Sequence, residues 1–320
     1  MICQSAFMCG DQVYSKQNDR SEHSSSHREK VETSPQASEE VSKAFVWPIS
    51  GTHTPDLPHS SAYGPRLKAS EGFRYDYHQG IDIPTPLSTT LVAVSTGTVR
   101  VAGAHPLYSD GVVQIDHGDG LYSNYLHVSA SLVVTGQEVA MGEPVARSGA
   151  SESGFPHLHF EIREGSVWRK DTVNPLRYLP YTDTVRHSIA ITQVLPSRAV
   201  WLRVTGPADE LDINQVTVTM RSLATQRVLD SRTLDYEARN RRYDGDPVLL
   251  DEPDLDSVLI QPHAFNSASE HYVVDFKVHD LRAEGAVQIT ACAVDINANQ
   301  VCVEETGTFD FGAYLTLIRR

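Results

Sequence analysis

The chain alternates short apolar runs with polar turns between about residues 91 and 163, and no part of this stretch shows the 3.6-residue period of a helix. The runs are rich in Val, Ile, Leu and Tyr and end at glycine or proline, which is typical of short strands. We therefore predict strands at residues 91–94, 98–102, 111–118, 121–127, 133–139 and 141–147. The pair Asp119-Gly120 predicts a hairpin turn between two of them.

The same type of pattern returns from residue 188 to the end of the chain. Apolar alternation predicts strands at residues 200–205, 215–220, 272–278, 287–294 and near 307–311. Short strands with polar connections over this length are typical of a β-sandwich of the immunoglobulin or fibronectin type. A domain boundary is expected near residues 181–187.

Composition adds a third segment to these two. Residues 1–43 are rich in Ser, Glu, Lys and Gln, and such a segment buries too little apolar surface to offset the entropy of ordering it. A chain of 320 residues is also long enough for two globular units. We expect an all-β protein with a disordered tail or linker at 1–43, a β-sheet domain at 44–184 and a β-sandwich accessory domain at 185–320.

Charge excludes one class of partner. The formal net charge is −14, so a nucleic-acid partner, which requires clustered Lys and Arg, is not expected. A run of about 18 apolar residues is missing, so no transmembrane segment is predicted. The first residues lack the basic start and apolar stretch of a signal peptide. Cys9 is open to two interpretations, the remnant of a lipid-attachment site or an incidental cysteine in the tail.

The cysteines Cys292 and Cys302 flank residues 296–299, a predicted hairpin turn. Their even separation allows both side chains to point to one face across the hairpin. A disulfide and a pair of buried free thiols are the two alternatives.

Candidate chemistry gathers in two short segments, His78-Gln79-Gly80-Ile81-Asp82 and His157-Leu158-His159-Phe160-Glu161. Alternate residues of a strand share a face, so the two histidines and the glutamate of the second segment point the same way. The first segment adds an imidazole and a carboxylate. Catalytic zinc commonly takes three protein ligands and leaves one position for water, so two His and one Asp with a further His to spare predict a metal-dependent hydrolase.

A third segment, Tyr125-Leu126-His127, completes a family resemblance. In this order the three segments resemble the signature motifs of the lysostaphin-type (LytM-like) zinc metalloendopeptidases, which cut peptide cross-links in bacterial peptidoglycan. The resemblance spans about residues 45–165 and includes Tyr63-Gly64-Pro65-Arg66 and the glycine-punctuated segment 136–145. It implies a lysostaphin-type β-sheet peptidase domain with one zinc ion per chain.

The resemblance also implies a role for each motif residue. His78, Asp82 and His159 are expected to bind zinc. His157 is expected to act as the general base, and His127 to stabilise the developing oxyanion.

Four further residues are expected near the site or in the family pattern. Glu161 is either a partner of a metal ligand or one half of a surface salt bridge. Arg66 either contacts the substrate or braces its loop. Phe155 departs from the small residues common before the His-x-His strand and is expected beside the cleft. His117 occupies a turn position common in the family and is not expected to be catalytic.

The expected function is therefore zinc-dependent hydrolysis of peptidoglycan peptide cross-links in the periplasm or cell envelope. The alternatives are a non-catalytic regulatory scaffold of the same fold, or a cell-wall-binding protein whose β-sandwich does the main work. Which cross-link is cut, and the oligomeric state, are not predicted.

Overall fold

The computed structural model describes residues 44–49, 62–68, 74–105, 108–151, 154–181, 186–194, 199–205, 212–242, 258–261, 269–275 and 286–308. The predicted tail at 1–43, with Cys9, lies outside these residues. Strands dominate the described part, and the all-β fold class is confirmed. None of the helices in this part is long and apolar enough to cross a membrane.

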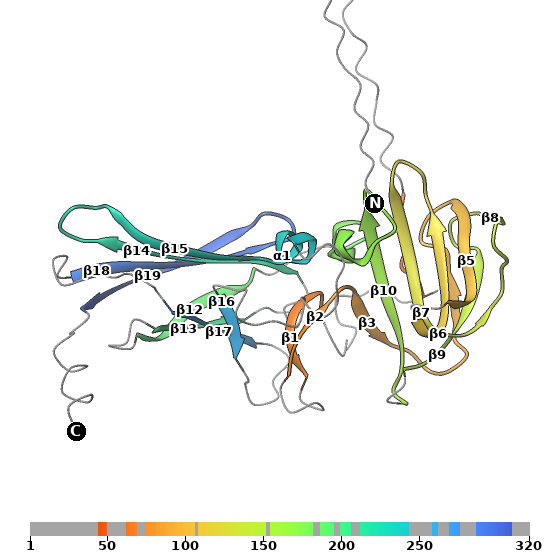
Figure 1. Ribbon diagram of the computed structural model, residues 1–320, viewed down its shortest axis with the longest axis horizontal. Coiled ribbons are helices and arrows are strands. Elements are labelled where there is room, and N and C mark those ends of the chain that lie inside the picture. The colour runs from red at the N-terminus through yellow and green to blue at the C-terminus, as the bar shows by residue number, and fades with distance from the viewer. Residues whose placement is uncertain are drawn as a thin grey trace, which may run out of the picture. The chain divides into compact units, whose positions relative to one another are not determined.

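A large antiparallel sheet occupies the first half, and Figure 1 shows its main strands β5, β6, β7, β9 and β10 side by side. Its order is β11-β10-β9-β7-β6-β5-β8, with β3 paired to β10 and β4 to β9. The strands are β3 (Ile81–Pro84), β4 (Thr90–Val92), β5 (Gly97–His105), β6 (Tyr108–Asp116), β7 (Leu121–Ser131), β8 (Glu138–Val139), β9 (Pro144–Ala150), β10 (Pro156–Glu164) and β11 (Thr172–Val173).

Strand β10 connects much of this sheet, because it pairs with four other strands, β3, β7, β9 and β11. One of its faces carries Leu158, Phe160 and Ile162, all with 0% exposure. Burying each such side chain contributes about 1.5–3 kcal/mol. A shift of one residue in the pairing would turn these side chains to the opposite face. The apolar face therefore fixes where the alternate residues of β10 point.

Shorter elements surround the sheet. A separate hairpin joins β1 (Gly64–Lys68) to β2 (Arg74–His78). The 3-10 turns η2 (Arg169–Asp171) and η3 (Pro175–Arg177) lie on either side of β11.

Two sequence predictions in this half meet different outcomes. The Asp119-Gly120 turn is confirmed, since both residues have positive φ and β6 pairs with β7 across them. The strand predicted at 133–139 is wrong for most of its length, because only Glu138–Val139 is extended. Gly136 has a φ of +88°, and its amide donates to the carbonyl of Val99. The turn at this glycine replaces strand pairing.

The second half contains two four-stranded antiparallel sheets, ordered β12-β13-β17-β16 and β15-β14-β18-β19. In Figure 1 the strands β14, β15, β18 and β19 of the second of these sheets lie beside one another. The elements are β12 (Ser188–Val194), β13 (Ala199–Thr205), β14 (Ile213–Ser222), β15 (Val228–Asp235), α1 (Tyr236–Arg242), β16 (Val258–Gln261), β17 (Ser269–Asp275), β18 (Ala286–Asp295) and β19 (Gln300–Thr308).

The second of these sheets follows the alternation expected from the sequence. Every second residue of β18, from Val287 to Ala293, is fully buried, and the residues between them are partly exposed. One apolar face per sheet is what a β-sandwich requires. The helix α1, in contrast, was not predicted. The boundaries proposed at residues 43–44 and 184–185 stay predictions.

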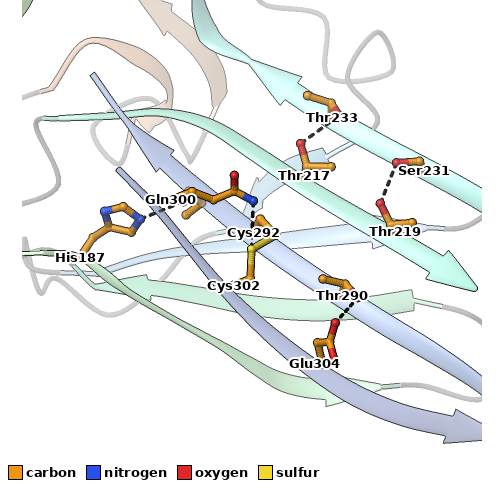
Figure 2. Close-up of a disulfide and its surroundings, with 11 residues drawn as sticks. His187, Thr217, Thr219, Ser231, Thr233, Thr290, Cys292, Gln300, Cys302 and Glu304 are labelled. Carbon is orange, nitrogen blue, oxygen red and sulfur yellow. Dashed lines mark hydrogen bonds between the residues drawn. A yellow bond between two sulfur atoms is a disulfide. The ribbon is translucent and has the colours of Figure 1, made fainter. Parts of the chain in front are cut away.

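The disulfide hypothesis is confirmed, and Figure 2 shows the bond between β18 and β19. Cys292 and Cys302 are direct partners in the strand register, with their Cα atoms 4.1 Å apart. The alternative of two buried free thiols is wrong. Nearby, on β14 and β15, hydroxyl pairs join Thr217 to Thr233 and Thr219 to Ser231 at the exposed surface.

Candidate active site

The two halves of the predicted site meet because β3 pairs with β10. In this register Asp82 lies directly opposite His159. Gly80 makes the close approach possible, since a Cβ there would lie 2.4 Å from the carbonyl oxygen of Phe160 and 2.9 Å from Nε2 of His159. Any side chain at this position would push the first motif away from β10.

Three donor atoms converge at this point. Nε2 of His78 lies 3.1 Å from Oδ1 of Asp82 and 2.9 Å from Nδ1 of His159, and that Nδ1 lies 2.9 Å from the same Asp82 oxygen. All three residues are buried. They form the one group of three or more His, Cys, Asp or Glu residues with converging donor atoms in the described part of the chain.

Each of the two imidazoles has an inner nitrogen that faces the other donors and an outer nitrogen that faces away from them. The hydrogen bond of the outer nitrogen determines whether the inner nitrogen carries a proton. Nδ1 of His78 lies 2.6 Å from the carbonyl oxygen of Ala62, and Nε2 of His159 lies 3.2 Å from Oε1 of Glu161. Both partners accept hydrogen bonds only, so both outer nitrogens carry the proton. In the neutral rings the inner nitrogens are then bare, and two lone pairs face a carboxylate oxygen. Such an arrangement requires a cation or a proton between the donors.

The pKa values of His78 and His159 shift in opposite directions. Burial lowers the pKa of His78 to about 4, with a further lowering from Arg66. Burial would also lower the pKa of His159, but its hydrogen bonds to Asp82 and Glu161 raise it overall. Burial would raise the pKa of Asp82, and the two neighbouring histidines instead hold it well below its usual range. A neutral His78 and an ionised Asp82 are the protonation states that a metal ligand needs.

The donor set fits a zinc ion. Zinc takes imidazole nitrogen and carboxylate oxygen at about 2.0–2.2 Å in tetrahedral geometry, which places neighbouring donors about 3.3 Å apart. The three separations of 2.9–3.1 Å are close to this edge length. Small outward movements of the side chains would accommodate the ion.

Glu161 supports this set from behind. It has 0% exposure, faces Nε2 of His159 and accepts a hydrogen bond from Nε of Arg163 at 2.9 Å. Burial would raise the pKa of Glu161, but Arg163 and His159 keep it far below its usual value. The expectation of a partner for a metal ligand fits this geometry, and the surface salt bridge is wrong.

The remaining two motif histidines lie beside the three donors. Nδ1 of His157 donates to the carbonyl of Phe155 at 2.9 Å, which leaves Nε2 bare and 3.6 Å from Oδ1 of Asp82. The ring of His127 lies 4.6 Å from that of His157 and 6.1 Å from that of His159. The structure therefore brings all five predicted site residues together, although their roles stay predictions.

Two of the further residues lie at the rim of this site. Phe155 is 48% exposed and its ring lies 5.6 Å from that of His157, so it stands beside the site as expected. Arg66 donates to Asp76 at 2.7 Å, and its Nη1 lies 3.6 Å from Oδ2 of Asp82. These contacts favour the bracing interpretation of Arg66.

His117 does not share these surroundings. Its two ring nitrogens face the carbonyl of Thr96 and the hydroxyl of Ser123, at 2.9 and 2.8 Å. Both contacts hold a buried turn in place, in agreement with a structural residue.

Two polar contacts at the site carry no signal in the sequence. Oδ2 of Asp110, on β6, lies 2.7 Å from Nδ1 of His127. Gln79, the residue after His78, donates from Nε2 to Oδ1 of Asn240 on α1 at 2.8 Å, and both residues have 0% exposure. Asn240 also donates to Oγ1 of Thr172 at 2.6 Å. Neither Asp110 nor Asn240 belongs to a motif, so only the fold reveals them.

Comparison with known proteins supports the resemblance over the same part of the chain. The sequence model of Peptidase family M23 matches residues 76–175, which include all five predicted site residues. The resemblance to lysostaphin-type peptidases is thus confirmed for this region.

Three curated relatives are similar over this region. The uncharacterized lipoprotein YgeR of Escherichia coli is 30% identical over 138 residues, 43% of this chain and 48% of that protein. The murein hydrolase activator NlpD of Salmonella dublin is 38% identical over 112 residues, 35% and 28% of the two chains. The peptidoglycan DD-endopeptidase ShyB of Vibrio cholerae is 34% identical over 104 residues, 32% and 24%. The chain spans less than half the length of each.

Among solved structures, a zinc-containing peptidase from Vibrio cholerae is 30% identical and covers 39% of this chain and 38% of that one, with a TM-score of 0.35.

Proposed function

We propose that the protein is a zinc-dependent endopeptidase that hydrolyses peptide cross-links of bacterial peptidoglycan. The observation that carries the proposal is the convergence of the bare nitrogens of His78 and His159 with the Asp82 carboxylate. A relative named as a peptidoglycan DD-endopeptidase supports the substrate class.

The side chains divide the work as follows. His78, Asp82 and His159 would hold the ion, which when bound would polarise the scissile carbonyl and the attacking water. His157 presents the bare Nε2 beside these ligands and would accept the proton of the water. His127 would stabilise the negative charge that develops on the carbonyl oxygen. Phe155 would form one wall of the substrate cleft.

The disulfide and the relatives support a proposal for the site of action. A disulfide persists in oxidising compartments and is rare in the cytosol. Relatives named as a lipoprotein and as a murein hydrolase activator fit the same compartment. We therefore place the protein in the periplasm or cell envelope.

The relative named as a murein hydrolase activator also supports a second candidate, a non-catalytic regulator. Such a protein has no need of a metal set or of a base beside it. The presence of His78, Asp82, His157 and His159 in one site favours catalysis.

The test is a combined zinc and sacculus assay. The wild-type protein should hold about one zinc ion per chain and release new amino ends from purified sacculi. His159→Ala should lose both properties, whereas His157→Ala should keep the zinc and lose about 10²- to 10⁴-fold in turnover. Zinc-loaded wild-type protein that leaves several cross-link chemistries intact, and instead stimulates a separate hydrolase, would favour the regulator.

A further inference from the structure

Asp110 is an acidic residue next to the site that the proposed mechanism leaves without a task. Its Oδ2 lies 2.7 Å from Nδ1 of His127, and both side chains are about three-quarters buried. A carboxylate oxygen only accepts, so Nδ1 of His127 carries the proton and donates it. The opposite ring nitrogen, Nε2, is left for the site.

The backbone at His127 supports a built arrangement. The residue has a φ of +57°, in the left-handed region that costs a non-glycine residue about 1 kcal/mol or more. The register also shifts there, since Gly111 pairs with Val128 and Val113 with Tyr125. Two residues of β7 therefore lie opposite one residue of β6, which is a β-bulge. Bulges next to active sites commonly redirect a side chain.

The two histidines beside the donor set differ in the partner of Nδ1. His157 donates to the neutral carbonyl of Phe155, while His127 donates to the Asp110 carboxylate. A carbonyl fixes the tautomer but adds no charge. A carboxylate also stabilises positive charge on the ring. Because Nδ1 of His127 donates to Asp110, Nε2 can donate to an oxyanion only after it takes up a second proton, and the ring is then an imidazolium. Burial lowers the pKa of His127, and the hydrogen bond to Asp110 opposes this lowering.

We propose that Asp110 is a positioning residue that orients His127 and stabilises its ring as an oxyanion donor. This inference rests on the proposed function. It explains why Nδ1 of His157 faces a carbonyl while Nδ1 of His127 faces a carboxylate. His157 accepts a proton at its bare Nε2. His127, held by Asp110 through Nδ1, donates from Nε2 once that nitrogen also carries a proton.

The test compares Asp110→Asn with His127→Ala and with the double variant, all loaded with zinc. Asp110→Asn should lower kcat on a cross-linked peptide about 10- to 100-fold, with KM and zinc content unchanged. Because Asp110 acts through His127, the double variant should be no slower than His127→Ala alone. Asp110→Glu, which keeps the carboxylate, should recover part of the lost kcat. Asp116→Asn, on the same strand but paired with Arg100 at the surface, is the matched control and should keep full activity.

A further loss of kcat in the double variant would overturn the proposal, as would equal loss in Asp116→Asn. A second measurement does not depend on catalysis. The ¹⁵N shifts of the His127 ring should show a protonated Nδ1 in the wild type and a changed proton distribution in Asp110→Asn. A bare Nδ1 in the wild type would overturn the proposal even if hydrolysis is observed. A protonated Nδ1 in a protein without hydrolytic activity would reject the proposed function but not the pairing.

Discussion

The sheet that contains β10 and the sheet that contains β18 both alternate two kinds of side chain along the strand, but the alternate positions have different surroundings in the two sheets. On β10 the alternate face buries His157, His159 and Glu161, while on β18 the alternate positions between the buried apolar residues are partly exposed. Buried ionisable groups are costly unless each has a partner. The first sheet supplies those partners from β3 and from β10 itself, through Asp82 and Arg163, whereas the second uses exposed hydroxyl pairs and a disulfide.

This contrast indicates where function is concentrated. Charged groups retained in a dry interior need a reason beyond stability, because apolar residues of the same size would fold as well or better. The donor set with its supporting carboxylates provides that reason in the first sheet. The described part of the second sheet pair has no group of three converging donors, and its buried ionisable groups include the pair His187 and Asp295, whose Nδ1 and Oδ2 atoms are 3.7 Å apart. The predictions below test this difference, in order of expected effect.

The largest effect is expected at Glu161. Glu161→Ala leaves the buried Arg163 guanidinium without its carboxylate and should lower the free energy of unfolding by about 3–5 kcal/mol. It should also weaken zinc affinity about 10- to 100-fold, because His159 loses the partner of Nε2. Urea unfolding and zinc titration measure the two effects. The control Glu304→Ala, on the exposed face of β19, should change stability by less than about 0.5 kcal/mol. Equal effects at both positions would remove the contrast.

Acid should destabilise the metal-free protein through His78. A histidine whose folded pKa is depressed takes up a proton on unfolding, so stability falls as the pH drops. The loss should occur between about pH 6.5 and pH 4, the range of this shift, and amount to about 3 kcal/mol. The raised pKa of His159 acts in the opposite direction in all variants that retain it. Urea unfolding at pH 7 and pH 4 should therefore show a smaller loss in His78→Gln than in the wild type. The same loss in both would contradict the assignment.

Removal of the disulfide should separate the two regions. A double change of Cys292 and Cys302 to serine should lower the stability of the β15-β14-β18-β19 sheet by about 2–3 kcal/mol. Zinc content and hydrolysis below the unfolding temperature should be unchanged, because the disulfide lies on β18 and β19 and the site on β2, β3, β7 and β10. Calorimetry and the sacculus assay measure both. Lost zinc in the folded variant would show that the regions are coupled through this bond.

The smallest effect is expected at Asn240. Asn240→Ala leaves buried polar groups of Gln79 and Thr172 without one partner and should cost about 1–3 kcal/mol. Because Gln79 follows His78, zinc affinity should fall as well. Thr233→Ala, which removes one exposed hydroxyl pair, is the control and should have little effect on either quantity. An unchanged zinc affinity in Asn240→Ala would limit this contact to a structural role. Deleting residues 185–320 would remove α1 together with this contact, so that truncation tests more than the β-sandwich.

The sequence by itself determined the strand character of both halves and the grouping of the site. Alternation on β10 assigns His157, His159 and Glu161 to one face, because the period of a strand is two regardless of the fold around it. The hairpin at 296–299 likewise brought Cys292 opposite Cys302.

Tertiary structure decided which partner each side chain meets. The pairing of β6 with β7 and its bulge place Asp110 on His127, and α1 brings Asn240 to Gln79. The strand predicted at 133–139 is wrong for a related reason. The amide of Gly136 donates to the carbonyl of Val99 on β5, and the turn held by this contact replaces the strand that the apolar residues predict. Contacts of this kind join residues far apart in the chain, and no local period encodes them. The five motif residues could therefore be read from the sequence, but the groups that orient them required the fold.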